Sequence, residues 1–531
     1  MQFRPSRSPQ PPPRLPAVAA IPEGDAPDIF PKPNWTATGA AIFGIALTAL
    51  LATGLVPSHV ARQAAYGILI SLAISIGIEA RAGVRNLIRA DLLAIVALFY
   101  LTLYEFLFPQ PFFDTMTSME ATNSGLLAVY LAFGSLLLGR HVPVPKKAPF
   151  ARLLQGEVPI GKLLGLFWLA AGLGYFWMLA CSEWNPVNVF QEMLGARFSQ
   201  PWSRGQLGDW RAIFSELTLM LYLLPALAGV MLARAERYRW YHLGPVLVVL
   251  LFTFFQGFAT GTRNVFGAYL VNFLAAFAFA SPAKKQTRVL AVAGVAAVAM
   301  AAATFVMLQF REHGIRDWMH GTYRERGELQ SKHVFVDYNL QTIATLTSMF
   351  PRAHPFLGME IPYLALIRPI PRAIWPDKPK GLSTTIEQAM GYEGVTISAT
   401  FAGESYISGG FLAIVVVGLG LGAVMGFWNT TASPRNSEIG ILVYASGFFA
   451  AVITMRSLFA FTTAVLPTIA SLCVAAVIVN TAQAGVVRMA KVFQRRAPKP
   501  LQARPRTAGR QVLVRRFGGT PPEVLPKPGG D

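Results

Sequence analysis

Long apolar segments recur along most of the chain, separated by shorter polar ones. A helix that crosses the roughly 30 Å hydrocarbon core of a bilayer needs about 20 mainly apolar residues. By that criterion the pattern predicts about twelve membrane-spanning helices. They cover residues 37–57, 64–80, 90–108, 124–140, 160–181, 212–233, 241–260, 264–281, 288–310, 406–428, 438–455 and 458–481.

The composition agrees with a chain that has little water-facing surface. Hydrophobic residues make up 53% of the 531 residues and charged residues only 14%, where soluble proteins carry about 25% charged residues. Within lipid, a helix satisfies all of its backbone hydrogen bonds internally. We therefore expect an all-α polytopic membrane protein.

The net charge of +19 would also fit a protein that binds nucleic acid. The basic residues, however, lie beside apolar segments and in the C-terminal tail, which favours anionic membrane lipid as the partner and no nucleic acid. Lysine and arginine gather in alternate loops, such as Arg234, Arg237 and Arg239 after the sixth predicted span. Such loops face the cytoplasm in membrane proteins, and this bias places both termini there as well.

This topology divides the chain into five parts. We expect a disordered cytoplasmic segment at 1–36, a membrane bundle of about nine helices at 37–310, an external loop with short helices at 311–405, about three further membrane helices at 406–481, and a basic disordered cytoplasmic tail at 482–531.

The predicted loop at 311–405 is about 95 residues long, and loops of such length are usually functional or disordered. This one is rich in aromatic residues and has no low-complexity composition. We expect it to fold in part as short helices on the outer face of the bundle, with 333–350 and 359–369 as the candidates.

Four arginines fall on the side of the membrane that is otherwise poor in basic residues. Arg263 and Arg456 lie in tight turns between spans, Arg311 ends the ninth span, and Arg372 lies in a proline-rich stretch. Guanidinium groups bind phosphate through paired hydrogen bonds, so four of them on one face would suit a diphosphate. Each arginine taken alone could equally reach for lipid headgroups.

Glu404 enters the membrane boundary on the same face, within Gly403-Glu404-Ser405-Tyr406. The neighbouring glycine permits close backbone approach. A carboxylate at this position can act as a general base, or it can pair with one of the arginines.

Several common signatures are missing from the sequence. It has no phosphate-binding glycine loop, no HExxH motif and no DxD carboxylate pair, and its histidines and two cysteines are scattered. We therefore expect no cofactor and no metal. Gly418, Gly422 and Gly426 recur every fourth residue, which predicts close packing against another helix rather than a ligand loop.

These stretches together resemble the bacterial oligosaccharide repeat-unit polymerases, the O-antigen and exopolysaccharide polymerases of the Wzy type. The resemblance covers roughly residues 160 to 480. It rests on Thr260-Gly261-Thr262-Arg263, Phe310-Arg311, Pro371-Arg372-Ala373-Ile374-Trp375-Pro376-Asp377-Lys378-Pro379 and Gly403-Glu404-Ser405-Tyr406.

The resemblance implies a C-type glycosyltransferase membrane fold with a large periplasmic loop, located in the bacterial inner membrane. The donor would be a growing glycan on undecaprenyl diphosphate and the acceptor a single lipid-linked repeat unit, with a chain-length regulator as a further partner. The expected catalytic residues are Glu404, Arg311 and Arg372, and the expected diphosphate ligands are Arg263, Arg311, Arg372, Lys378 and Arg456.

Five further residues are secondary candidates. Some members of this family carry an Arg-x10-Gly pattern in two outer loops, and Arg197 with Gly208 and Arg316 with Gly327 fit that spacing. Asp337, His333 and Tyr406 complete the set. Two other functions remain open at this point: a lipid-linked oligosaccharide ligase, and a flippase or transporter of the same lipid.

Overall fold

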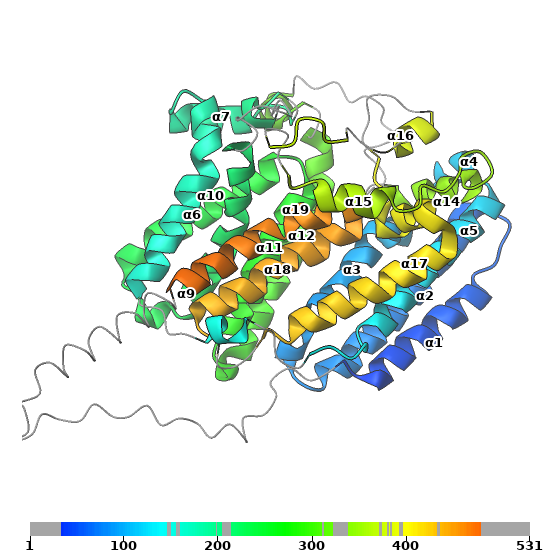
Figure 1. The fold of residues 1–531 in the computed structure, drawn as a ribbon, viewed down its shortest axis with the longest axis horizontal. Helices are drawn as coiled ribbons and strands as arrows, with labels where there is room; N and C mark the ends of the chain where they lie inside the picture. The colour runs from blue at the N-terminus through cyan, green and yellow to red at the C-terminus, as the bar shows by residue number, and fades with distance from the viewer. Residues whose placement is uncertain are drawn as a thin grey trace, which may run out of the picture. The chain divides into compact units, whose positions relative to one another are not determined.

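The computed structural model describes residues 33–145, 150–155, 160–197, 199–203, 214–310, 313–321, 338–370, 374–379, 382, 385–391, 397–432 and 436–478. Throughout these ranges the regular secondary structure is helical (Figure 1). Residues 1–32 and 479–531, which contain most of the two predicted terminal segments, lie outside the described residues.

Ten helices in the described ranges are long and apolar enough, by length and composition, to cross a membrane. They are α2 (Pro57–Ala80), α5 (Met119–Gly139), α6 (Ile160–Cys181), Phe214–Ala233 with α9 (Leu223–Ala233) as its last part, α10 (Trp240–Ala259), α11 (Arg263–Ala280), α12 (Gln286–Phe310), α17 (Thr400–Asn429), α18 (Glu438–Arg456), and Leu458–Ile478, which begins with η8 (Leu458–Ala460) and α19 (Phe461–Ala464). These helices support a multi-pass membrane protein.

Two further apolar helices, α1 (Trp35–Leu51) and α3 (Ala90–Thr102), are 17 and 13 residues long. They coincide with the first and third predicted spans but are shorter than the usual crossing length. The remaining short 3-10 helices are η1 (Val84–Leu87), η2 (Tyr104–Leu107), η3 (Ala151–Leu154), η4 (Pro201–Ser203), η5 (Leu217–Tyr222), η6 (Ala235–Arg237) and η7 (Ala283–Lys285).

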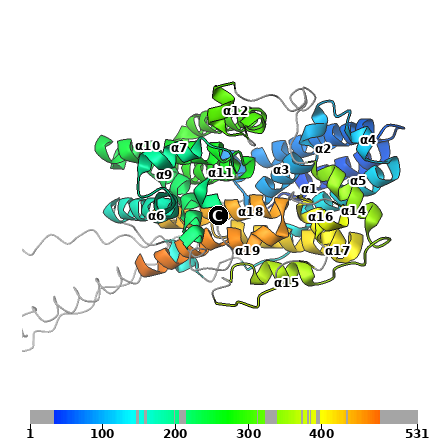
Figure 2. The ribbon, with the colours of Figure 1, turned by 90° about the horizontal axis from the view of Figure 1, so that it is seen from above.

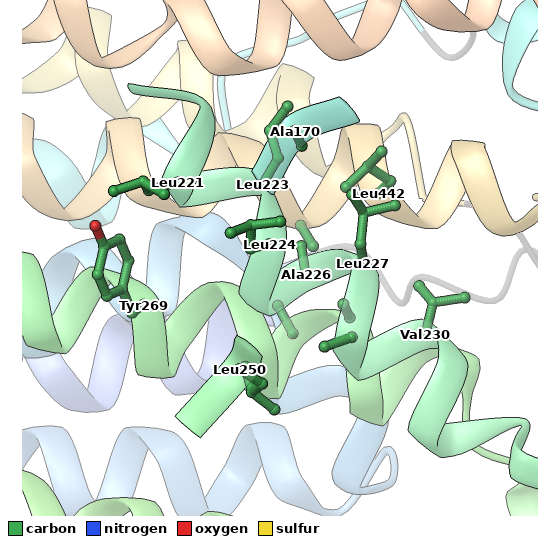
Figure 3. Packing of buried hydrophobic residues seen from close by; sticks show 14 of the residues in the cluster. Ala170, Leu221, Leu223, Leu224, Ala226, Leu227, Val230, Leu250, Tyr269 and Leu442 are labelled. Carbon is green, nitrogen blue, oxygen red and sulfur yellow. The ribbon is translucent and has the colours of Figure 1, made fainter. Parts of the chain in front are cut away.

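The helices pack around two large hydrophobic cores. One core is formed mainly by α6 and α9–α12, where Leu223, Leu224 and Leu227 interlock with neighbouring helices (Figure 3). The other is formed mainly by α1 to α5, which include the short α4 (Phe113–Met116), and by α14 (Asn339–Met349) and α17. Helix α18 joins them, because its residues up to Phe448 belong to the first core and Met455 belongs to the second.

Six short helices complete the fold. They are α4 (Phe113–Met116), α7 (Pro186–Met193), α13 (Ile315–Met319), α14 (Asn339–Met349), α15 (Glu360–Ile367) and α16 (Ile386–Ala389). Figure 1 shows α4, α7, α14, α15 and α16 at one end of the bundle, which we call the loop end; the other is the opposite end.

Helix α14 differs from the expectation of a helix on the outer face. Its residues Leu340, Ile343 and Leu346 are fully buried, and Ala344 lies against Gly125 of α5. The predicted piece 333–350 therefore contributes a helix to the second core, and part of the long segment between α12 and α17 is interior.

The glycine repeat of α17 forms a seam with α5. A Cβ atom on Gly422 would lie 2.7 Å from the Leu136 carbonyl oxygen, and one on Gly139 would lie 2.4 Å from the Leu419 carbonyl oxygen. Neither distance is compatible with a side chain, so the backbones touch. The prediction that Gly418, Gly422 and Gly426 serve helix packing is confirmed.

Helix α17 is broken at Gly409 and Gly410, where Gly410 has φ 69° and ψ −159°, a conformation open essentially to glycine alone. The break frees the carbonyls of Ile407 and Ser408, which accept hydrogen bonds from the backbone N–H groups of Leu357 and Gly358 at 2.8 and 2.9 Å. The segment leading into α15 is thereby attached to α17.

Candidate functional site at the loop end

Arg263 and Arg456 lie at the ends of two packed helices. Arg263 is the first residue of α11 and Arg456 is the last residue of α18. Ala268 of α11 packs in one cluster with Phe449 and Ala450 of α18. Each arginine lies one to two helical turns beyond this contact, about 7.5 to 9 Å along its helix. The two predicted diphosphate ligands therefore share the loop end of one helix pair.

Glu404 lies in the first part of α17, before the break, and is 4% exposed. Its carboxylate accepts a hydrogen bond from the Ser457 hydroxyl at 2.6 Å and another from the Leu458 backbone N–H at 2.6 Å. Leu458 begins the last apolar helix, whose N-terminus carries partial positive charge. The carboxylate thus acts as a cap for that helix.

Glu404 is also close to the end of α18 that carries Arg456. The Ser398 hydroxyl, just before α17, donates to the Arg456 carbonyl oxygen at 3.1 Å. The start of α17 is therefore joined to the junction between α18 and η8 by Ser398 and Glu404. The backbone N–H of Phe459 also interacts with this carboxylate, so its partners in the described part of the chain are a hydroxyl and two backbone N–H groups, and no ion pair to an arginine is found there.

The Lys378 side chain lies at the C-terminus of α15 (Glu360–Ile367). The Lys378 ammonium donates to the carbonyl oxygens of Arg368 and Ile370, each at 2.9 Å. These bonds close the proline-rich stretch back onto α15. Lys378, predicted as a diphosphate ligand, thus contributes at least part of its donor capacity to the backbone.

Arg368 was not singled out by the sequence analysis. Its positive charge interacts electrostatically with Glu404 and with Glu216, and Lys378 also acts on Glu216. Arg368 is exposed and follows directly on α15. Its position immediately before Pro369 was a usable signal, because a residue before proline tends to end a helix and so lies at a helix boundary.

Tyr406 serves to hold α14 in place. Its hydroxyl lies 3.1 Å from the Phe350 carbonyl oxygen and 3.3 Å from that of Thr347, both at the end of α14. Tyr406 is only 5% exposed. Tyr406 therefore holds the C-terminal end of α14 against the first part of α17.

Arg316 lies in a separate part of the loop end. Its backbone N–H donates to the Leu194 carbonyl oxygen at 2.9 Å, and its guanidinium donates to that of Gln191 at 2.7 Å. These bonds dock the segment after α12 onto the last turn of α7 and the residue that follows it. Arg197 follows Leu194 by three residues, so the two secondary candidates belong to neighbouring segments.

Four predicted site residues, Arg311, Arg372, Asp337 and His333, lie outside the described residues. The convergence of all four arginines on one face therefore stays a prediction. Within the described residues, no cluster of histidine, cysteine, aspartate and glutamate could hold a metal ion.

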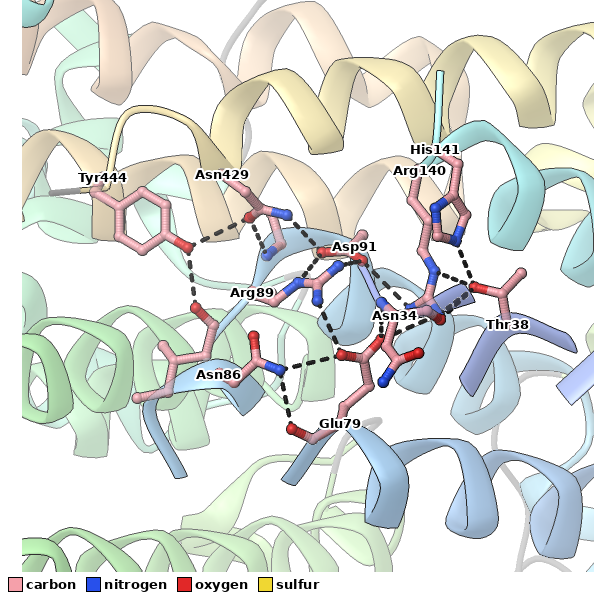
Figure 4. Close-up of polar contacts among 12 residues, drawn as sticks. Asn34, Thr38, Glu79, Asn86, Arg89, Asp91, Arg140, His141, Asn429 and Tyr444 are labelled. Carbon is pink, nitrogen blue, oxygen red and sulfur yellow. Dashed lines mark hydrogen bonds and ion pairs between the residues drawn. The ribbon is translucent and has the colours of Figure 1, made fainter. Parts of the chain in front are cut away.

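A second ionisable cluster, at the opposite end, was missed by the sequence analysis (Figure 4). Glu79 at the end of α2, Arg89 and Asp91 at the start of α3, and Arg140 at the end of α5 are each at most 2% exposed. Arg89 pairs with Glu79 at 3.2 Å and with Asp91 at 2.5 Å. Arg140 pairs with Glu79 at 3.1 Å and with Asp91 at 3.6 Å. The two positive and two negative charges cancel.

Neutral side chains connect this ionic network to three more helices. Asn429 of α17 donates to Asp91 at 2.5 Å, and Tyr444 of α18 donates to the Ile88 carbonyl oxygen at 2.9 Å. Thr38 of α1 accepts from Arg140 at 3.0 Å. Removing one partner of a buried ion pair typically costs about 3–5 kcal/mol, because the other charge is then uncompensated. The ionic network and these neutral side chains hold six helices in one arrangement.

His141 borders the ionic network, stacked on Trp35 with ring centroids 3.7 Å apart. Its Nε2 atom lies 2.6 Å from the Thr38 hydroxyl, which also accepts from Arg140. Burial, together with the positive charges of Arg140 and Arg89, lowers the pKa of His141 to about 4. His141 is therefore neutral near pH 7.

These features define a multi-pass helical membrane protein with exposed and buried ionisable groups at the loop end and a neutral ionic network at the opposite end. Comparisons with protein-family models, with curated proteins and with solved structures found no match for this chain.

Proposed function

We propose that this protein polymerises undecaprenyl-diphosphate-linked oligosaccharide repeat units at the periplasmic face of the bacterial inner membrane. The proposal rests on the resemblance of its motifs to the Wzy-type polymerases and on the groups gathered at the loop end. In this proposal the loop end faces the periplasm, as the distribution of lysine and arginine favours, and the bundle is a C-type glycosyltransferase-like membrane fold.

One observation carries the proposal: Arg263, Arg456 and Glu404 belong to the loop end of adjoining helices, and Arg368 acts electrostatically on Glu404. Charged residues buried within membrane-spanning helices are costly and usually functional, and Arg263 and Glu404 are only 6% and 4% exposed. A cationic group of this kind suits a diphosphate, because guanidinium binds phosphate oxygens bidentately.

The proposed reaction is a displacement at the anomeric carbon of the donor glycan. A hydroxyl oxygen of the acceptor forms the new bond to that carbon, the bond to the lipid diphosphate breaks, and the diphosphate leaves with the electron pair. Arginines stabilise its charge, with each contact contributing about 1.5–3 kcal/mol. The hydroxyl proton passes to a base, for which Glu404, Asp337, His333 and the substrate itself are the candidates.

The hydrogen bonds of Glu404 favour a positioning role over that of the base. Both of its oxygens accept from the start of the last apolar helix. By this capping, Glu404 would hold the junction next to Arg456. A carboxylate with two engaged oxygens keeps further lone pairs, so it can still accept a proton, and the Glu404→Gln variant separates the two roles.

The place of the break in α17 speaks against a transporter. Substrate sites of transporters lie near the bilayer midplane, where helices are interrupted. The part of α17 after the break, 411–429, has 19 residues and is about 28 Å long, nearly the thickness of the hydrocarbon core. The break is therefore close to the end of a span. The alternative of an oligosaccharide ligase shares the same chemistry and differs in its acceptor.

The test is polymerisation in vitro with purified undecaprenyl-diphosphate repeat units, read as a ladder of chain lengths. Arg263→Lys and Arg456→Lys keep the charge but lose the planar fork. We expect each to slow elongation by about 10- to 100-fold, the equivalent of one lost charge-assisted contact. Arg352→Lys is the matched control, since Arg352 is an exposed loop-end arginine 3.4 Å from Glu120. Ladders at the wild-type rate from both Arg263→Lys and Arg456→Lys would refute the proposed site.

A further inference from the structure

Two short segments at the opposite end are joined by an ion pair. The Lys285 ammonium of η7 donates to the Glu236 carboxylate of η6 at 2.7 Å. That hydrogen bond, together with the charges of Lys285 and Arg288, lowers the pKa of Glu236 below its ordinary value. The loop before α10 and the loop before α12 therefore form one surface.

Positive charge is in excess on this surface. Its carboxylates are Glu236 and Glu438, the first residue of α18, which Arg234 and Arg237 share. Six cations lie in the two loops and at the start of α12, namely Arg234, Arg237, Arg239, Lys284, Lys285 and Arg288. Within the described residues, four positive charges are thus uncompensated. The ionic network at the same end of the molecule differs, because it is buried and has two charges of each sign.

Aromatic side chains hold two of these cations. The Arg288 guanidinium lies over the Phe277 ring of α11, 5.2 Å from the ring centroid. The Arg239 guanidinium donates to the Tyr241 hydroxyl at 3.0 Å. Both arginines are exposed, and neither forms an ion pair in the described part of the chain. Contact with an aromatic side chain positions a guanidinium without neutralising its charge.

The surface lies where α10 and α12 begin. Trp240 and Tyr241, the first two residues of α10, are 84% and 45% exposed. Exposed tryptophan and tyrosine at the end of an apolar helix are typical of the headgroup level of a membrane.

Apolar helix faces adjoin this level. Leu247 and Leu251 of α10 and Leu290 of α12 are exposed. Seen from above, α10 and α12 lie at the edge of the bundle, outside α11, against which both pack (Figure 2). An anionic headgroup bound to the two loops would therefore have apolar side chains beside it for its acyl chains.

We propose that this surface binds a phospholipid with two phosphates, of the cardiolipin type. We call it the α10–α12 basic surface, and it consists of Arg237, Arg239, Lys284 and Arg288. Basic clusters between membrane helices recognise such headgroups. Two phosphates match the surplus of positive charge better than the single phosphate of phosphatidylglycerol. The proposal is independent of the polymerase function, because it concerns the other end of the molecule.

The experiment measures lipid binding to the full-length protein by native mass spectrometry, with cardiolipin and phosphatidylglycerol added in turn. We expect cardiolipin to bind more tightly. Arg239→Gln combined with Arg288→Gln should weaken cardiolipin binding by about 25-fold, since each cation near a lipid surface contributes about fivefold. Arg81→Gln is the matched control, because Arg81 is exposed at the same end but follows α2, and it should bind as the wild type does.

Three results of this experiment would overturn the proposal. Unchanged binding in the double glutamine variant would remove the two arginines from the site. An equal loss in Arg81→Gln would show that any cation at this end acts alike. Equal affinity for cardiolipin and phosphatidylglycerol would refute the assignment of two phosphates.

Lysine variants separate charge from packing. Arg239→Lys combined with Arg288→Lys keeps both charges, so most of the cardiolipin binding should remain. A loss equal to that of the glutamine variants would attribute the effect to the lost aromatic contacts and would overturn the role of charge.

The deacylated headgroup tests whether the ligand is a lipid. Bis(glycerophospho)glycerol has no acyl chains to cover the apolar helix faces, so it should compete with cardiolipin on the order of tenfold more weakly or worse. Competition as strong as that of intact cardiolipin would identify a site for a soluble anion and would overturn the assignment to a lipid.

Discussion

The carboxylate of Glu404 occupies the position of a capping group at the start of the last apolar helix. The sequence allowed us to predict that Glu404 lies at a membrane boundary, because the neighbouring apolar run is local. Its partners Ser457 and Leu458 are more than 50 residues away, and pairing over that distance depends on how α17 and α18 pack. The sequence analysis accordingly left its role open between a base and an arginine partner.

Glu404→Gln separates positioning from proton transfer. Glutamine retains one acceptor oxygen but loses the charge at the helix N-terminus, so we expect a lower apparent melting temperature. Elongation should remain within about tenfold of the wild-type rate, because a general base would contribute 10²- to 10⁴-fold. Ser457→Ala is the control, since it removes one bond to the same carboxylate and no titratable group. A loss of 10²-fold or more at unchanged melting temperature and unchanged lipid binding would assign Glu404 as the base.

Arg89 and Arg140 form buried ion pairs that a count of lysine and arginine in the loops does not reveal. Both arginines fall in predicted cytoplasmic loops and would be counted there as free cations, yet both are buried and neutralised by Glu79 and Asp91. The pair Arg140–Glu79 joins residues 61 positions apart, and no local pattern indicates it. Arg234 and Arg237 in another predicted cytoplasmic loop likewise pair with Glu438. Because the rule counts lysine and arginine rather than net charge, the bias still favours the same orientation.

His141 predicts a pH dependence of stability. Its pKa is about 4 in the folded protein and near 6.5 when unfolded, so the unfolded state binds more protons between these values. Stability should therefore fall as the pH decreases from about 6.5 to about 4, and the contribution of this group should be complete at neutral pH. The measurement is the apparent melting temperature at pH 6.5 and pH 4.5 for the wild type and for His141→Gln. Carboxylates titrate in both proteins, so the difference isolates His141; an identical decrease in the two would contradict the assignment.

At the scale of elements, α17 combines a feature that the sequence predicts with one that it does not. Glycines at every fourth position are a local pattern with one common cause, close helix packing. The break at Gly409 and Gly410 depends on a distant partner, because the freed carbonyls are taken by Leu357 and Gly358. The start of α17 at Thr400 was predicted six residues late, at 406, because residues 400–405 include Thr400, Glu404 and Ser405 and are less apolar than the run that follows.

The glycine seam can be tested within one helix. A methyl group on Gly422 would meet the backbone of Leu136 and Gly139 at 2.7 and 2.8 Å, whereas one on Gly420 meets nothing within 4 Å. We expect Gly422→Ala to lower the free energy of unfolding by about 1–3 kcal/mol, the usual cost of overpacking. Gly420→Ala should be neutral or slightly stabilising, since alanine favours the helix. Thermal unfolding in one detergent measures both; equal melting temperatures would show that α5 and α17 do not touch at this point.

At the scale of the molecule, α18 connects two cores that are built mainly from different helices of the chain. Its residue Tyr444 reaches the ionic network, and its last residue Arg456 belongs to the candidate site at the loop end. The helical class and the approximate positions of the apolar helices follow from hydrophobic runs alone. The division into two cores does not, because apolar residues facing lipid and apolar residues facing another helix have the same composition.

The orientation of the bundle decides whether the loop end can meet a periplasmic substrate. In a variant with Cys181 and Cys473 replaced by alanine, single cysteines at Ala353 and Gln286 report on the two ends, since both positions are exposed. Ala353 lies between α14 and α15 at the loop end, and Gln286 begins α12 at the opposite end. We expect a membrane-impermeant maleimide to label Ala353→Cys in intact spheroplasts and Gln286→Cys only after the membrane is opened, as the lysine and arginine distribution requires. The reverse pattern would place Arg263, Arg456 and Glu404 in the cytoplasm, and the proposed polymerase reaction at the periplasmic face would then be wrong.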